Sequence, residues 1–280
     1  MLHDDEGDNI SIKNRSFCEL TAQYWAWKNV DADYYGFFHY RRYLSFNPDD
    51  HSEDEWGNIN FDSIDSDMID RIKLYPDNME SIITQYDVIT VRGRKLTADS
   101  STGTVPADIH DEYRIPPFQH REDLDLVLSI IRKKYPAFVS AADAYMHSNI
   151  AYECNMFIMK KDIFKAYASW LFDILFEAER EIDTSQYDAA EYRVFGYLAE
   201  RLCGIYITWL KMQKGIAAAE LPKTLIRNTE PKEVTIKPYK DGAVTIVTSA
   251  NNAFAPYLDV FLKSVLEHSS TDHTYDIVIL

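Results

Sequence analysis

The sequence has no long apolar run, few cysteines and no excess of positive charge, and each absence excludes a class of protein. No apolar stretch approaches the ~20 residues that a membrane-spanning helix needs. The three cysteines are Cys18, Cys154 and Cys203, which lie far apart and form no C-x-x-C pair. That spacing favours buried free thiols over a metal site, a catalytic thiol or a disulfide framework.

The charge balance is strongly acidic, with 45 Asp and Glu against 29 Lys and Arg and a net charge of -16. Such a chain is a poor electrostatic partner for nucleic acid or for an anionic membrane. Met1 is followed by an acidic, polar segment rather than by a signal peptide. We therefore expect a cytoplasmic protein, with peripheral attachment at the inner face of the membrane as an open alternative. Hydrophobic residues make up 46% of the 280 residues, enough for a large core.

Cations follow the first strand that the sequence predicts. Residues 34–38 are apolar and aromatic, which is typical of a buried strand, and Gly36 allows another backbone to approach closely. His39, Arg41 and Arg42 come directly afterwards, and burying them without partners would be costly. Ligands of open α/β sheets bind at the carboxyl ends of the strands. The pattern therefore predicts a site for an anion such as a diphosphate.

A second strand, predicted over residues 86–91, is followed by Arg92 and Arg94. In a parallel sheet the two sets of cations would form one basic rim, although Arg and Lys after a strand are also often simply solvated. The Ser, Thr and Gly residues of segment 98–106 predict a mobile loop that could close over such a site.

Other polar residues have two interpretations. Asn155 stands in a predicted apolar strand over residues 153–159, where it could form a structural hydrogen bond or contact a substrate hydroxyl. Three Asp-x-Asp motifs, at residues 31–33, 65–67 and 123–125, could hold Mg²⁺ or Mn²⁺ against a diphosphate. Their positions in surface segments or at helix starts explain them better, so a divalent metal stays a candidate cofactor with no assigned ligand.

Periodicity and terminal signals predict the remaining elements. Ser16 and Glu19 are spaced as a capping box at the start of an aromatic helix. A polar loop is predicted over residues 47–60, and Gly204 is the predicted C-cap of the last helix, with an edge strand after it at residues 205–210. The other predicted helices cover residues 121–134, 137–147, 161–182 and 187–203.

The last part of the chain predicts a separate unit. Residues 211–240 have no clear periodicity and predict a linker. Strands are predicted over residues 244–249 and 275–280, around a helix over residues 257–267. This is the opening βαβ unit of a nucleotide-binding domain, which either docks onto the first domain or continues in a longer protein.

Several motifs resemble a known family. They are residues 19–29, the HYRRY motif within residues 33–43, residues 155–160 and residues 193–202. In this combination they resemble the domain of unknown function 4422 family, over about residues 1–210. That family acts in bacterial capsular and O-antigen polysaccharide synthesis and includes transferases that use UDP-galactofuranose. Residues 241–280 resemble the truncated start of a family 8 glycosyltransferase, notably at residues 255–257 and 264–266.

The resemblance implies a GT-A-like α/β fold, with a mostly parallel, Rossmann-like sheet flanked by helices and without the family's usual first strand. It implies transfer of a sugar from a UDP-sugar to a glycan or lipid-linked glycan acceptor. The alternative is a non-catalytic carbohydrate-binding or assembly fragment of a larger synthase. The implied roles are donor-diphosphate binding for His39, Arg41, Arg42, Arg92 and Arg94, acceptor binding for Asn155, and general base catalysis for Glu200, ahead of Glu191 and Asp188.

Overall fold

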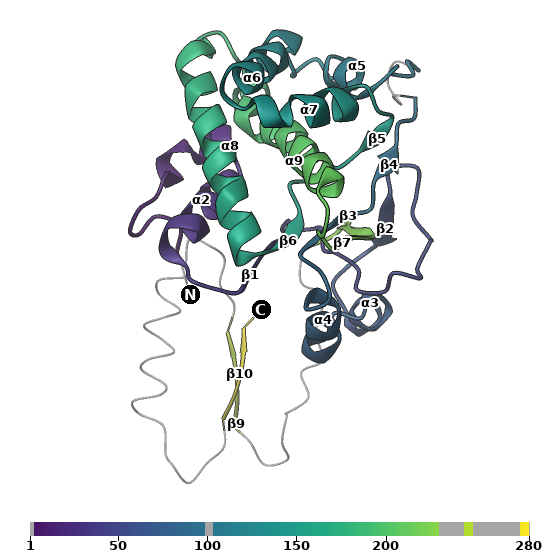
Figure 1. Cartoon of the computed structure of the whole chain (residues 1–280). Helices are drawn as coiled ribbons and strands as arrows, with labels where there is room; N and C mark the ends of the chain where they lie inside the picture. The colour runs from purple at the N-terminus through teal and green to yellow at the C-terminus, as the bar shows by residue number, and fades with distance from the viewer. Residues whose placement is uncertain (1–2, 99–102, 230–243, 249–274, 280) are drawn as a thin grey trace. The chain divides into compact units, whose positions relative to one another are not determined.

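The computed structural model describes residues 3–98, 103–229, 244–248 and 275–279 (Figure 1). Contacts divide the chain into a large compact unit, His3–Arg227, and a second unit that includes Asn228–Leu280. The candidate site lies in the large unit, which is a mixed α/β structure.

The elements of the large unit follow one another in this order: η1 (Ser11–Lys13), α1 (Asn14–Phe17), α2 (Leu20–Asn29), β1 (Tyr34–Phe37), β2 (Asn58–Phe61), α3 (Ser66–Ile72), α4 (Pro76–Ile83), β3 (Val88–Val91), β4 (Arg94–Lys95), α5 (Ile109–Tyr113), α6 (Arg121–Lys134), η2 (Pro136–Phe138), α7 (Val139–Met146), β5 (Ile150–Ala151), β6 (Phe157–Lys160), α8 (Lys161–Glu181), η3 (Glu191–Arg193), α9 (Val194–Met212), β7 (Ala218–Leu221) and β8 (Lys223–Ile226).

The central sheet has four strands in the order β1-β6-β3-β7. Strands β1 and β3 both run antiparallel to β6, and β7 runs parallel to β3, so three of the four strands share one direction. The predicted α/β fold with a largely unidirectional sheet is confirmed, with β6 as the reversed strand. Phe157 at the start of β6 pairs with Phe37 and Thr90, near the ends of β1 and β3. The carboxyl ends of β1 and β3 therefore flank the amino end of β6 at one edge.

Both faces of the sheet are covered, because side chains alternate along each strand. Val88 and Met159 pack into the large core formed with α6, α8 and α9, whereas Ile89 and Ile158 pack on the opposite face. Partly buried residues in and beside α4 cover that second face. The helices α6 to α9 lie together on one side of the sheet and α3 and α4 lie apart from them (Figure 1). This arrangement explains why the β3 segment is apolar on both faces.

Gly36 permits the close strand contact that its position predicts. A Cβ atom at this residue would lie 3.2 Å from Cγ1 of Ile158 in β6, closer than ordinary van der Waals contact. Predicted helices over residues 121–134, 137–147 and 161–182 are confirmed as α6, η2 with α7, and α8. All three cysteines are free, and Cys203 is buried.

The prediction of a helix end at Gly204 is wrong. Helix α9 begins at Val194 and continues to Met212, so the segment 205–210 is helical rather than an edge strand. A Cβ at Gly204 would lie only 2.1 Å from Cζ of Tyr145 in α7. The glycine is therefore needed for close packing of two helices, a tertiary requirement that resembles a C-cap signal in sequence.

The predicted capping box is also wrong. Ser16 lies inside α1 and its hydroxyl donates to the carbonyl of Lys13, while α2 begins at Leu20. Cys18 separates the two helices with a φ of 53°. The Glu19 carboxylate accepts a hydrogen bond from Nδ2 of Asn155 at 2.7 Å. The side chain that the local pattern assigned to capping therefore bonds to a residue far away in the sequence.

The predicted linker contains two strands. Strand β7 forms the edge of the central sheet beside β3, and β8 pairs in parallel with β2, which itself lies at the end of the predicted 47–60 loop. The large unit therefore ends at Arg227 rather than near residue 210. The β7 sequence Ala218–Leu221 has weak strand propensity, and pairing with β3 overrides it.

In the second unit, the two predicted strands are confirmed as the parallel pair β9 (Val244–Thr248) and β10 (Tyr275–Ile279). The helix predicted over residues 257–267, and residues 99–102 of the predicted mobile loop, lie outside the described residues. In the part of the chain that the structure describes, no helix combines the length and the apolar character needed to cross a bilayer.

Candidate functional site

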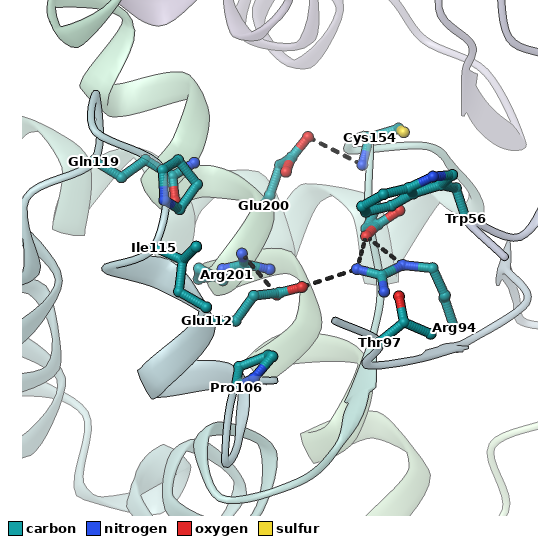
Figure 2. Close-up of a pocket in the computed structure, with 12 residues that line it drawn as sticks. Trp56, Arg94, Thr97, Pro106, Glu112, Ile115, Gln119, Cys154, Glu200 and Arg201 are labelled. Carbon is teal, nitrogen blue, oxygen red and sulfur yellow. Dashed lines mark hydrogen bonds and ion pairs between the residues drawn. The ribbon is translucent and has the colours of Figure 1, made fainter. Parts of the chain in front are cut away.

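A cavity of about 240 Å³ opens at the strand edge where β6 begins. Figure 2 shows side chains from several distant segments converging on it. Its lining residues are Trp56, Arg94, Thr97, Pro106, Glu112, Ile115, Pro116, Gln119, Glu153, Cys154, Glu200 and Arg201.

A chain of buried ion pairs forms one wall of the cavity. Lys223 donates to one oxygen of Glu153 at 2.5 Å, and Arg94 donates to the other at 2.5 and 2.8 Å. Arg94 also donates to Glu112 at 2.8 Å, and Arg201 donates to the second oxygen of Glu112 at 3.1 Å. The network ties β8, β4, α5 and α9 to the segment before β6. Mutual neutralisation is what makes burial of these charges tolerable.

The pKa values within the network follow from this pairing. Burial alone would raise the pKa of Glu153, but Lys223 and Arg94 outweigh burial and lower it below the ordinary value. For Arg94, burial favours the neutral form, and Glu153 and Glu112 reverse that effect and raise the pKa. Glu153 and Arg94 are therefore both charged near neutral pH.

Glu200 differs from its carboxylate neighbours because no cation among the described residues forms an ion pair with it. Burial raises the pKa of Glu200 to about 7, with Arg201 opposing and Glu19 and Glu153 reinforcing the rise. Its Oε1 accepts a hydrogen bond from the backbone N–H of Cys154 at 3.0 Å. A carboxyl group that titrates near neutral pH and lines a cavity can take up or release a proton during a reaction.

The Cys154 amide is aimed at Glu200 by an unusual turn. Cys154 and Asn155 both have positive φ angles, 71° and 48°, just before β6 begins. Non-glycine residues adopt such angles only when the surrounding structure holds them there. Asn155 supplies part of that hold, because its Nδ2 donates to Glu19 and to the carbonyl of Gly196 in α9.

Of the cations after β1, Arg42 lies near this cavity. His39 and Arg42 exchange backbone hydrogen bonds and so close a tight turn. Arg42 is near enough to Cys154 to lower the pKa of its thiol, although burial dominates and raises that pKa to about 12. Burial lowers the pKa of His39, which favours the neutral ring. Among the described residues, Nδ1 of His39 and Nε of Arg41 and Arg42 are buried without a hydrogen-bond partner.

The structure separates the two cations that follow β3 from this set. Arg92 forms an ion pair with Glu53 and donates to the carbonyls of Pro48 and Asp50, so it anchors the 47–57 loop. Arg94 lines the cavity, but Glu153 and Glu112 already neutralise its charge. Arg92 and Arg94 therefore lie in local ion pairs, and diphosphate binding by His39, Arg41 and Arg42 stays a prediction.

Asn155, Glu191 and Asp188 also occupy positions away from the cavity lining. Asn155 is 2% exposed and is engaged by Glu19. Asp188 and Glu191 cap each other reciprocally, since the Asp188 side chain accepts from the Glu191 N–H and the Glu191 side chain accepts from the Asp188 N–H. Asp188 faces a different hollow of about 690 Å³, so of the three carboxylates only Glu200 reaches the cavity.

The sequence interpretation missed most of the cavity wall. Glu112 and Glu153 had no motif to mark them, Arg201 was assigned no role within the 193–202 motif, and Lys223 fell in the predicted linker. Trp56 is a large aromatic residue in an otherwise polar loop, and that contrast is the one signal that could have identified it. No group of three or more His, Cys, Asp or Glu side chains within the described ranges could hold a metal ion.

Comparisons with known proteins agree with this architecture. The family described as "Domain of unknown function (DUF4422)" matches residues 1–213. A solved structure titled "WbbM bifunctional glycosytransferase apo structure" matches with a TM-score of 0.76 and 36% identity. The match covers 99% of this chain and 48% of that chain, so this chain spans about half of its length. Curated protein sequences gave no significant match.

The family match over most of the large unit, together with a solved relative that shares its fold, leads to one conclusion: this chain belongs to the DUF4422 family.

Proposed function

We propose that this chain is a glycosyltransferase that moves a sugar from a nucleotide-sugar donor to a hydroxyl of a glycan or lipid-linked glycan acceptor. The observation that carries the proposal is Glu200, a carboxyl group with a pKa of about 7 at the wall of a cavity near Arg42, whose Nε has no hydrogen-bond partner among the described residues. The structural relative is itself described as a glycosyltransferase, which supports the same reaction class.

In this reaction Glu200 acts as the general base. Its carboxylate accepts the proton of the acceptor hydroxyl, and the freed oxygen forms a bond to the anomeric carbon of the donor. The bond between that carbon and the diphosphate oxygen breaks, and the nucleoside diphosphate leaves with the electron pair. Arg41 and Arg42 offset the charge that develops on the diphosphate.

The finer assignment is a UDP-sugar donor, with galactofuranose as the candidate sugar, and a growing capsular or O-antigen polysaccharide as the acceptor. The motif resemblance of residues 33–43 and 193–202 supports it. Residues 241–280 are proposed to begin a second, family 8 transferase domain. The parallel pairing of β9 with β10 and the description of the relative as bifunctional support that proposal.

The test compares Glu200→Gln with Glu191→Gln in an assay of UDP-sugar turnover with an acceptor glycan. Glutamine keeps the shape of Glu200 but cannot accept the proton, so turnover should fall by roughly 10²- to 10⁴-fold. Glu191→Gln should retain most of the activity, because Glu191 lies outside the cavity lining.

Equal activity of Glu200→Gln and the wild type would remove Glu200 as the base. Binding of UDP-sugar without any turnover by the wild type would instead favour the alternative, a carbohydrate-binding or assembly fragment of a larger synthase.

A further inference from the structure

Four polar atoms in the cavity wall lack hydrogen-bond partners among the residues that the structure describes. They are Oε1 of Gln119, Oγ1 of Thr97, and Nε and Nη1 of Arg201. The arginine is 7% exposed, so bulk solvent does not reach its N–H groups, and its other neighbours are the Tyr145 hydroxyl and the Tyr113 ring. Buried polar groups of this kind normally have partners, which indicates that a ligand supplies them. Because the set contains acceptors as well as donors, the ligand must carry groups that do both, as hydroxyls do.

An aromatic side chain forms another part of the wall. Trp56 is 37% exposed and belongs to the loop that Arg92 anchors through Pro48, Asp50 and Glu53. Figure 2 shows the indole beside Arg94, whose guanidinium carbon lies 5.4 Å from the ring centroid. A sugar ring has an apolar face of C–H groups that can pack on such a ring, while its hydroxyls reach polar partners around it.

The charge of the cavity lining does not favour a diphosphate. Of the charged side chains that line the cavity, Arg94 and Arg201 are cations, and the other three are carboxyl groups, Glu112, Glu153 and Glu200. The lining therefore offers an anion no excess of positive charge, whereas an uncharged ring needs none.

The volume of the cavity also favours a single sugar ring. The cavity of about 240 Å³ is smaller than the roughly 300–1,000 Å³ typical of pockets for drug-sized ligands, so it suits one ring rather than a whole nucleotide sugar.

We propose that this cavity is the subsite for the terminal, uncharged sugar ring of the acceptor, with Trp56 as its stacking platform and Gln119 and Arg201 as its hydroxyl contacts. The assignment to the acceptor rests on the proposed function, because the base that lines the cavity must contact the acceptor hydroxyl. The donor diphosphate then lies outside the cavity, at Arg41 and Arg42.

Saturation-transfer NMR on the full chain tests binding directly. The probes are the methyl glycosides of galactose, glucose and mannose, with UDP as a comparison. At least one glycoside should show transfer to its ring protons, and Trp56→Ala should abolish that signal. Gln119→Ala removes an unpartnered acceptor and should weaken binding roughly 2- to 10-fold without loss of folding. Tyr75→Ala is the matched control, since Tyr75 is also an exposed aromatic but lies outside the cavity lining.

The absence of any glycoside signal, a signal that Trp56→Ala and Gln119→Ala leave unchanged, or displacement of the glycoside by UDP would each overturn the subsite.

Steady-state kinetics separate this proposal from the proposed function. Gln119→Ala should raise KM for the acceptor and not for the donor, and Arg41→Ala should do the reverse. Turnover with an unchanged acceptor KM in Gln119→Ala would overturn the subsite alone. Glycoside binding that depends on Trp56, in a chain without turnover, would support a sugar site and reject the transferase.

Discussion

Glu200 shows how one residue obtains its chemistry from its surroundings. It lies in the same cavity wall as Glu112 and Glu153, yet those two are bound to Arg94, Lys223 or Arg201 and Glu200 is not. The network therefore uses the available cations for structure and leaves one carboxyl group with a pKa of about 7. Neighbouring acids whose pKa values are driven apart in this way commonly divide structural and catalytic roles.

The raised pKa of Glu200 predicts a pH-dependent stability. The folded state keeps the proton of this group up to about pH 7, whereas the unfolded chain releases it near the ordinary value of 4.5. Stability from this group is thus complete below the unfolded value and is lost as pH rises through the folded value. Glutamine has no such proton, so Glu200→Gln should gain up to roughly 3 kcal/mol over the wild type above neutral pH and little in acid.

Urea denaturation of both proteins at about pH 5 and about pH 8 measures the effect. A difference in unfolding free energy that stays the same at both pH values would contradict the raised pKa. A difference that grows as the pH falls would mean that folding lowers the pKa of Glu200 instead of raising it.

At the scale of elements, α9 organises both the site and the helical layer. Glu200 and Arg201 reach the cavity, while buried residues along α9 from Val194 to Leu210 fix the helix against α7 and α8. Gly204 is what allows Tyr145 to pack against α9, and the Tyr145 hydroxyl in turn accepts from the N–H of Tyr152, two residues before the Cys154 turn. The contact between α7 and α9 is therefore mechanically linked to the turn at Cys154.

Gly204→Ala should destabilise the protein although alanine favours helices. The added Cβ would lie 2.1 Å from Cζ of Tyr145, and such overpacking costs about 1–3 kcal/mol or more against a gain in propensity of about 1 kcal/mol. Gly196→Ala in the same helix is the control, because its Cβ would meet Sγ of Cys18 at 3.1 Å and a small shift relieves that contact. Urea unfolding of both variants should show the larger loss for Gly204→Ala. Equal effects would mean that Tyr145 can move aside.

At the scale of the large unit, the chain after α9 returns to complete the sheet. Strand β7 covers the edge of β3, and β8 brings Lys223 to Glu153 in the cavity wall. Lys223 is 4% exposed, so it is part of the interior and not a surface cation. The segment 214–227 therefore contributes both to the sheet and to the electrostatics of the site.

A truncation tests this contribution. Residues 1–227 should fold with one cooperative urea transition, whereas residues 1–213, the extent of the family match, should fold weakly or not at all. The shorter chain lacks the β7 pairing and leaves Glu153 buried without Lys223, and breaking a buried pair in this way costs about 3–5 kcal/mol. Equal transition midpoints for the two chains would show that β7 and β8 are dispensable.

The sequence alone was enough for the features that depend on local pattern. Apolar runs and helical periodicity predicted β1, β3, α6, α8 and the two strands of the second unit. Four motifs in combination, HYRRY among them, identified the family. Glu200 was selected from a family motif, and its placement at the cavity agrees with that choice while its role stays a prediction.

Tertiary structure decided the features that depend on distant partners. Gly204 looks like a helix end until Tyr145 is placed against it, and Ser16 and Glu19 look like a cap until Asn155 takes the carboxylate. The weak strand β7 exists because β3 offers it an open edge. The cavity itself unites residues from Trp56 to Arg201, and a pKa of about 7 at Glu200 arises from burial, which no local pattern encodes.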